Sequence, residues 1–203
     1  MRIIAWLTIA AVGLGVAGCD KKETPAKPST EPAASAAGAV SAKAADVPKA
    51  PENIERLDFP GTEEGAMALV QAFLEPDADT AAMTRSLRPS TEDYGDIFVD
   101  DVLTEVRSKY EERWNEGKYE IKAKEGQTKV LMWKATTEEL REGTGDSSDF
   151  PGGYKKVADK LEPGLTFYRF KFVKPDDKHG MTYDGLVFVN GHWVIVSKPY
   201  RAM

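Results

Sequence analysis

Cysteine and histidine are scarce in this chain of 203 residues, which has one cysteine, Cys19, and two histidines, His179 and His192. A single cysteine rules out a disulfide within the chain. The closed zinc sites of proteins use four cysteine or histidine ligands, which this chain cannot supply. The acidic stretch at residues 77–81 lacks the third acid and the glycine of an EF-hand calcium loop. The sequence therefore predicts no metal site.

An excess of positive charge is also missing, because the formal net charge is −6 at pH 7. Proteins that bind a phosphate backbone carry a basic patch or stripe, and none is visible in this sequence. No serine lies in a Gly-x-Ser-x-Gly motif. Gly143-Thr144-Gly145 does not lie between a strand and a helix, as a phosphate-binding loop does. The sequence predicts no nucleic-acid partner and no cofactor.

Long apolar runs are lacking except at the N-terminus, where Met1-Arg2 precede an uncharged apolar segment at residues 3–17. This pattern is typical of a secretory signal, and the run is shorter than the roughly 20 residues of a membrane-spanning helix. The run ends in Val16-Ala17-Gly18-Cys19, which resembles the lipobox of bacterial lipoproteins. The resemblance implies that residues 1–18 are a signal peptide and that the Cys19 thiol carries diacylglycerol. The alternative is a soluble export signal with an incidental cysteine.

A lipid at Cys19 predicts a location in the cell membrane or the outer membrane, with the rest of the chain outside the cytoplasm. Two or three acyl chains anchor a protein stably, at about 0.8 kcal/mol per buried methylene. Asp20 directly follows the cysteine. In enteric bacteria an aspartate at that position resembles an inner-membrane retention signal. The membrane is the one partner that this N-terminal resemblance implies.

Residues 19–53 differ sharply in composition from the rest of the chain, because alanine, proline, lysine, serine and threonine dominate them. Such a segment cannot bury enough apolar surface to offset the entropy of ordering it. Prolines also interrupt any helix that the alanines start. We expect a disordered tether over residues 19–53, followed by a single domain at residues 54–203.

Helices are expected first in this domain and strands afterwards, which is typical of the α+β class. The expected helices cover residues 62–75, 79–87 and 90–117, with short helical turns at 137–142 and 154–161. The expected strands cover residues 119–123, 127–136, 165–174, 183–189 and 192–197. Asn190-Gly191, between two apolar strands, is the strongest short-range signal for a two-residue hairpin turn.

The order of helices, hairpin, short helix and three long antiparallel strands resembles the nuclear transport factor 2-like fold. The segment from Gly185 through Asn190-Gly191 and Trp193 to Val196 is similar to the final hairpin of such domains. Over residues 62–198, the resemblance implies N-terminal helices packed on a curved antiparallel sheet that forms a cone.

Members of that superfamily include isomerases, cyclases and dehydratases, which place an aspartate or a His–Asp pair inside the cone. By this resemblance, Asp184 is the candidate catalytic carboxylate. The candidate pocket residues are Tyr94, Trp133, Tyr168 and Trp193. No residue of this chain matches a catalytic motif of the superfamily, and buried aromatic side chains more often fill a core than line a pocket.

Three functions stay open. The first is a membrane-anchored envelope protein whose domain binds a small ligand or an envelope protein, with Arg169 and Lys171 as contact residues on the sheet. The second is an enzyme of the isomerase or cyclase type that uses Asp184. The third is a structural envelope protein without a ligand. A buried, unpaired carboxylate in a cavity favours the enzyme, whereas a cone filled by aromatic side chains favours a structural or protein-binding role.

The lipid at Cys19 gives a first prediction. Replacing the thiol in Cys19→Ser removes the atom that would carry the lipid, so the variant should leave the membrane fraction and take up no palmitate. Membrane fractionation and palmitate labelling measure the two effects. Uptake of palmitate by the variant contradicts the lipobox assignment.

Overall fold

The computed structural model describes residues 54–203, and the predictions on Cys19, the signal peptide and the tether lie outside the described residues. Helices and an antiparallel sheet make up the described part, which confirms the predicted α+β class. The helices are α1 (Glu63–Ala72), α2 (Thr80–Ser86), α3 (Thr91–Ile97), α4 (Asp100–Asn115), α5 (Thr137–Glu142) and α6 (Gly153–Val157), with short 3-10 helices η1 (Gly145–Asp149), η2 (Ala158–Lys160) and η3 (Pro199–Arg201). The strands are β1 (Lys129–Thr136), β2 (Thr166–Val173), β3 (Gly180–Val189) and β4 (His192–Ile195).

The four strands pair in chain order, β1-β2-β3-β4, and each pair is antiparallel. The predicted hairpin at Asn190-Gly191 is confirmed, because Val189 pairs with His192 across the turn. Asn190 and Gly191 have φ angles of 50° and 78°. Positive φ at both central residues is the backbone of the turn that suits the twist of a two-residue hairpin.

A bulge interrupts β3 at Gly185. Tyr168 pairs with Leu186 and Arg169 pairs with Asp184, so Gly185 is the extra residue on its strand. Its φ of +84° is accessible to glycine at little cost. A glycine bulge bends the strand and increases its twist. Asp184 therefore lies inside a bent strand, whereas the sequence placed it near a strand start.

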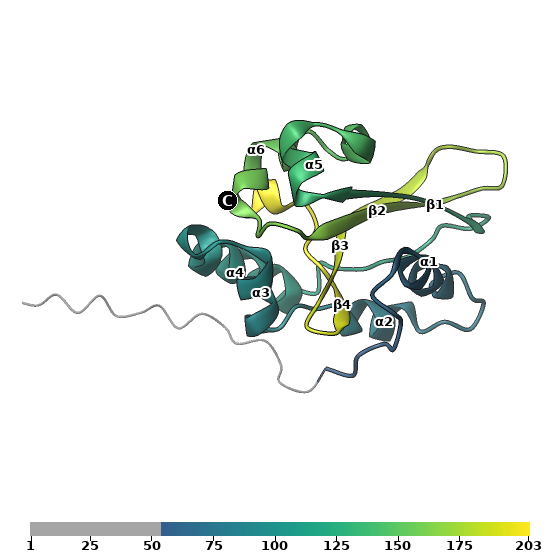
Figure 1. Ribbon diagram of the computed structural model, residues 1–203. Helices are drawn as coiled ribbons and strands as arrows, with labels where there is room; N and C mark the ends of the chain where they lie inside the picture. Colours follow the sequence, from purple (N-terminus) through teal and green to yellow (C-terminus); the bar gives the residue numbers. More distant parts are fainter. Residues whose placement is uncertain (1–53) are drawn as a thin grey trace, which may run out of the picture. The chain divides into compact units, whose positions relative to one another are not determined.

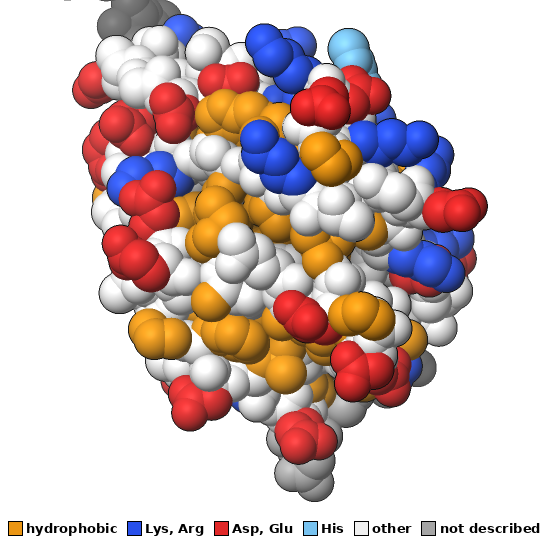
Figure 2. All heavy atoms as spheres, turned by 90° about the vertical axis from the view of Figure 1, so that its right-hand side faces the viewer, with side chains coloured by type: hydrophobic (Ala, Val, Ile, Leu, Met, Phe, Trp, Pro, Cys, Tyr) orange, Lys and Arg blue, Asp and Glu red, His pale blue; other side chains and the backbone are white. Residues whose placement is uncertain are grey.

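Helices cover both sides of the sheet (Figure 1). In that view α5 and α6 lie above β1 and β2, and β3 and β4 turn down between α1 and α3. The largest fully buried side chains are mostly aromatic, and the biggest, Trp193, is 2% exposed. Within residues 54–203, no helix has the length and apolar character needed to cross a membrane. The side of the domain on the right of Figure 1 has hydrophobic side chains across its middle, with charged side chains of both signs mostly around its rim (Figure 2).

The prediction of one helix over residues 90–117 is wrong, because the chain breaks between α3 and α4. Phe98 is extended, with φ −121° and ψ 137°, and forms a β-bridge with Leu161. The Val99 N–H donates to the Lys160 carbonyl at 3.2 Å. These contacts with a distant segment, together with the complete burial of the Phe98 ring, outweigh the local preference for an unbroken helix.

The strand predicted at residues 119–123 is also absent from the described structure. The Ile121 N–H donates to Thr84 Oγ1 at 3.1 Å, and the Lys122 N–H donates to the Tyr183 hydroxyl at 2.9 Å. Side chains from α2 and β3 thus satisfy backbone groups that a neighbouring strand would otherwise pair with. Residues 119–123 still alternate between more buried and exposed side chains, although they pair with no neighbouring strand.

The bulge at Gly185 gives a second prediction. A Cβ at Gly185 would lie 2.2 Å from the Val196 carbonyl oxygen, whereas a Cβ at Gly117, which also has positive φ, meets nothing within 4 Å. We expect Gly185→Ala to lower the free energy of unfolding by about 2–4 kcal/mol, and Gly117→Ala by about 1 kcal/mol. Chemical denaturation measures both losses. Equal losses of unfolding free energy in the two variants would show that the short distance between residue 185 and the Val196 carbonyl does not affect stability.

Candidate functional site

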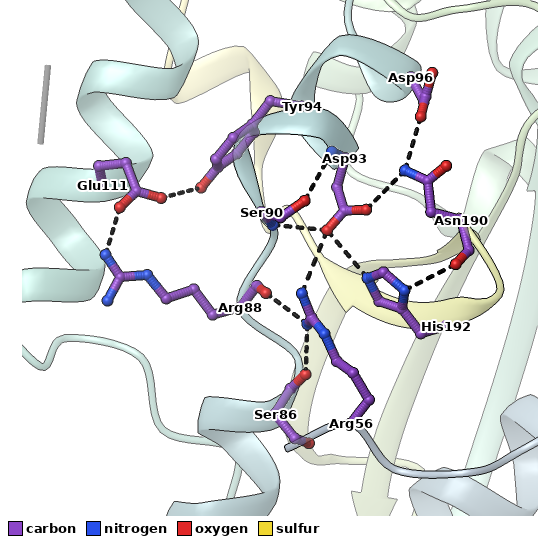
Figure 3. Close-up of polar contacts among 10 residues, drawn as sticks. All are labelled: Arg56, Ser86, Arg88, Ser90, Asp93, Tyr94, Asp96, Glu111, Asn190 and His192. Carbon is purple, nitrogen blue, oxygen red and sulfur yellow. Dashed lines mark hydrogen bonds and ion pairs between the residues drawn. The ribbon is translucent and has the colours of Figure 1, made fainter. Parts of the chain in front are cut away.

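The Asp93 carboxylate is fully buried at the start of α3 and accepts hydrogen bonds from separate segments of the chain (Figure 3). Its Oδ2 accepts from the Ser90 N–H at 2.6 Å, which closes the capping box of α3. Its Oδ1 accepts from Asn190 Nδ2 at 2.9 Å. His192 Nε2 and Arg56 Nη2 lie 3.1 Å and 3.5 Å from Oδ2. These five residues are called the Asp93 cluster below.

Two other members of the cluster, Arg56 and His192, are held by backbone carbonyl groups as well as by Asp93. Arg56 Nη1 donates to the carbonyl oxygens of Ser86 and Arg88, at 2.8 Å and 2.7 Å. His192 Nδ1 lies 3.1 Å from the Asn190 carbonyl oxygen. Both ring nitrogens of His192 therefore face oxygen atoms of the protein. The arrangement fastens the segment before α1 to the end of α2 and to the β3–β4 turn.

A second buried carboxylate, Glu111 on α4, is 1% exposed and faces Arg88 and Tyr94 (Figure 3). Arg88 Nη2 forms an ion pair with Glu111 Oε2 and donates to Asn115 Oδ1 at 2.8 Å. The Tyr94 hydroxyl donates to Glu111 Oε1 at 3.2 Å. Burial, with the nearby Glu111 charge, raises the pKa of the Tyr94 hydroxyl far above its usual range, so this group remains a donor. The loss of either ion-pair partner would leave a buried charge uncompensated.

The hydrogen bonds of the cluster decide the charge of Asp93. Burial alone would raise the pKa of the Asp93 carboxyl. Hydrogen bonds from Asn190, Ser90 and His192 outweigh burial and lower that pKa below its usual range. Asp93 is therefore ionised at neutral pH, and its negative charge balances the Arg56 guanidinium.

A cavity of about 530 Å³ adjoins this part of the domain, between the segment before α1, helix α2 and the end of α4. Arg88 and Ser86, which take part in the contacts described above, lie in its wall. Ile54, Leu57 and Met83 contribute apolar surface. This cavity is called the α2–α4 cavity below. Its volume lies in the range of small-molecule sites.

Two buried donors in the lining of the α2–α4 cavity lack an acceptor. Trp114 is 8% exposed, and its Nε1 has no hydrogen-bond partner in the described structure. Arg88 Nε is also buried without a partner there, although the Nη2 atom of the same guanidinium is paired. An unsatisfied buried donor costs about 1–3 kcal/mol, so such groups call for an explanation.

The structure brings together only two of the five site residues expected from the sequence. Tyr168 and Trp193 pack edge to face, with ring centroids 5.5 Å apart, and both are buried. Trp193 Nε1 donates to the Pro60 carbonyl at 3.1 Å, so its polar atom is satisfied. Tyr94 lies apart from them, stacked on Tyr110 and bonded to Glu111. These three aromatic side chains fill the core.

Trp133 and Asp184 lie elsewhere. Trp133 is partly exposed on the sheet face that also carries Arg169 and Lys171, and the Lys171 Nζ lies 5.1 Å from its ring centroid. Asp184 is 2% exposed and well bonded. Its Oδ1 accepts from the Tyr154 hydroxyl and the Lys198 N–H, both at 2.8 Å. The carboxylate that the sequence singled out is therefore paired with protein donors.

The sequence interpretation missed Asp93, Glu111 and the α2–α4 cavity. Ser90-Thr91-Glu92-Asp93 has the form of a capping box, a local signal that turns the Asp93 carboxylate back toward the chain but does not indicate its burial. Glu111 lies three residues before Trp114, on the apolar face of its helix, which is a signal for an inward-facing acid. No local pattern indicates a cavity formed by residues 54–57, α2 and Trp114, because these segments are distant in sequence.

The lowered pKa of Asp93 gives a third prediction. Its ionised form stabilises the domain above the unfolded-state pKa, and this contribution is lost as the pH falls through the folded-state pKa. Asp93→Asn should lower the free energy of unfolding by about 2–4 kcal/mol at pH 7, with the loss shrinking toward pH 3. Urea denaturation across this pH range measures the effect.

Asp96→Asn is the matched control, because Asp96 is exposed on the same helix and also accepts from Asn190, at 2.7 Å. We expect a loss below about 1 kcal/mol for this variant. A loss for Asp93→Asn that does not change with pH would contradict the ionised state of Asp93 and the role of its charge.

Within residues 54–203, no group of three histidine, aspartate, glutamate or cysteine side chains is arranged to hold a metal ion. The features that bear on function are instead the Asp93 cluster and the α2–α4 cavity beside it. Comparison with known protein families, with curated proteins and with solved structures finds no match to this chain.

Proposed function

We propose that this protein is an exported lipoprotein, anchored at Cys19, whose α+β domain binds a small ligand in the α2–α4 cavity. The lipobox-like Val16-Ala17-Gly18-Cys19 and the short apolar run before it support the anchor. The low-complexity residues 20–53 support a tether with a reach of a few tens of ångströms on the scaling of about 5–6 Å × √n. The domain then works outside the cytoplasm, beside the cell membrane or the outer membrane.

The observation that carries the binding function is the pair of buried, unpartnered donors at the α2–α4 cavity. The indole N–H of Trp114 and the Nε–H of Arg88 each lower the stability of the domain, because a buried donor without an acceptor costs free energy. A ligand oxygen at each donor removes that cost.

The lining of the cavity indicates the kind of ligand. Ile54, Leu57, Ala82, Met83 and Trp114 offer apolar surface, whereas Glu55, Asp79, Arg85 and Arg88 bring two charges of each sign. A balanced lining does not favour a strongly charged ligand. The domain therefore binds an amphipathic small molecule with an apolar body and one or two acceptor oxygens.

We assign the domain to the nuclear transport factor 2-like group of folds. The order of elements supports this assignment, because helices precede β1, two short helices follow it, and three antiparallel strands close the domain. The bulge at Gly185 bends the sheet as the wall of a cone requires. The first strand of the expected hairpin is missing at residues 119–123, so the sheet has four strands in the described part.

The hydrogen bonds of the two buried carboxylates, Asp184 and Asp93, favour a binding function over a catalytic one. Asp184 accepts from Tyr154, Ser197 and Lys198, and Asp93 accepts from its whole cluster. A general base needs an oxygen or nitrogen within reach of the substrate proton. Both carboxylates are instead occupied by hydrogen bonds that hold the fold together. An envelope protein remains the second class of partner, through the partly exposed Trp133 and the cations beside it.

The α2–α4 cavity gives a fourth prediction, with 1-anilinonaphthalene-8-sulfonate as the probe because it combines apolar rings with acceptor oxygens. We expect saturable binding at one site on the natively folded chain, measured by fluorescence titration. Ala82→Phe places a ring in the cavity and should weaken binding at least about tenfold. Trp114→Phe removes the N–H donor and should also weaken it.

Ala81→Phe is the matched control, because Ala81 is exposed on the same helix and does not line the cavity. Thermal unfolding of each variant shows whether it is folded. Equal binding by the folded Ala82→Phe and Ala81→Phe variants would overturn the assignment of the ligand to this cavity.

A further inference from the structure

A groove of about 470 Å³ runs between the end of α4, the loop after it, β3 and η3. Its lining contains four basic side chains, those of Arg113, Lys118, Lys198 and Arg201, and one acidic side chain, that of Glu120. The α2–α4 cavity has equal numbers of both signs, as does the cavity beside Trp133. In a chain whose net charge is −6, this basic groove is an exception that composition does not explain.

Most of these cations are not used in ion pairs within the domain. Lys118 pairs with Glu116 at 2.7 Å. Arg113, Lys198 and Arg201 form no ion pair with another residue of the described part, 54–203. Like charges gathered in a hollow repel one another and focus a positive potential there. An anion in the groove would offset this repulsion.

The rim of the groove is held in place by buried groups. Lys198 has a left-handed backbone with φ 55°, which is unfavourable for a residue with a side chain. The buried Asp184 carboxylate fixes this conformation by accepting the Lys198 N–H. The Tyr110 hydroxyl donates to the Ser197 carbonyl at 3.1 Å, and Arg113 Nη2 donates to the Arg201 carbonyl at 3.0 Å. Strained backbone held by its surroundings is common at binding sites.

Tyr119 supplies a second, independent sign of a ligand. Its hydroxyl is buried and finds no acceptor for its proton in the described structure, although Arg113 lies close to its oxygen and Tyr119 lines the groove. Burial raises the pKa of this hydroxyl to about 12 despite the opposing effect of Arg113, so it is a donor at neutral pH. The hydroxyl of Tyr183, also in the lining, is already satisfied by the backbone of Lys122. The Tyr119 hydroxyl is thus a donor without an acceptor, in a groove that also contains the four basic side chains.

From this geometry we propose that the basic groove binds a phosphate group, with Lys198, Arg201 and Arg113 as its cations and Tyr119 as a neutral donor. The surplus of positive charge favours a phosphate, which carries about −1.5 to −2 at pH 7, over a single carboxylate. Arginine and lysine are the side chains that recognise phosphate oxygens. The phosphate belongs either to a lipid headgroup or to a soluble phosphoester. This site is separate from the α2–α4 cavity and does not depend on the function proposed for it.

Titration calorimetry of the purified full chain in nonionic detergent tests this proposal, with inorganic phosphate and acetate as probes at constant ionic strength. We expect saturable phosphate binding that is tighter than acetate binding. Lys198→Gln together with Arg201→Gln should weaken phosphate binding at least about tenfold. Lys171→Gln with Lys178→Gln is the matched control, because it removes two charges from another surface and should change binding less than about twofold.

Tyr119→Phe tests the unpartnered hydroxyl without changing the charge. We expect it to weaken phosphate binding by about threefold to tenfold. Its midpoint of thermal unfolding without phosphate should be unchanged or higher, because the variant deletes an unsatisfied buried group. A purely structural tyrosine would give the opposite result, a lower midpoint with unchanged affinity.

Sedimentation with vesicles separates the two sources of phosphate and uses the Cys19→Ser chain, so that the lipid anchor does not contribute. Binding to vesicles with phosphatidic acid but not to pure phosphatidylcholine identifies a headgroup. Binding of inorganic phosphate without vesicle binding identifies a soluble ligand. The absence of both, or equal loss in the two charge-removal double variants, would overturn the proposal.

Discussion

The Asp93 carboxylate joins parts of the domain that are distant in sequence, and the docking of the segment before α1, of α3 and of the β3–β4 turn depends on it. Through Arg56 it holds the segment before α1, through Ser90 it starts α3, and through Asn190 and His192 it fastens the β3–β4 turn. A buried carboxylate is tolerated only when hydrogen bonds and a countercharge compensate for its lost hydration. The domain therefore keeps its N-terminal segment docked only while this network is complete.

Asp184 has the corresponding role at the basic groove. Both acids are buried, and each accepts donors from more than one element. Asp93 supports the wall of the α2–α4 cavity, because Arg56 also binds the carbonyl groups of Ser86 and Arg88. Asp184 supports the rim of the basic groove through the Lys198 backbone. Trp114 of the cavity and Tyr119 of the groove stack with ring centroids 4.2 Å apart, so the two hollows share a wall.

Sequence reasoning succeeded where one local pattern decides the structure. The Asn190-Gly191 turn and the alternation in residues 165–174 each depend on neighbours in the chain, and both are confirmed. It failed where contacts with distant segments outweigh local preference. At Phe98, the bridge to Leu161 ends the helix that the local sequence predicts to continue. The cavity and the groove were not predictable for the same reason. Segments that are distant in sequence line both the cavity and the groove. The charge of the groove also depends on which basic side chains the fold brings together, and no local pattern indicates this.

The position of the α2–α4 cavity connects the proposed tether to the proposed ligand. Ile54, Glu55 and Leu57 line the cavity, and they directly follow the segment expected to lead to Cys19. A ligand that contacts these side chains gains binding free energy only when they are docked, so binding and docking of the segment favour each other. The Arg56 contacts, within the same stretch, already favour the docked state and lower the ordering cost of binding. A ligand in the α2–α4 cavity would therefore be coupled to the segment that, on the proposed anchoring, joins the domain to the membrane.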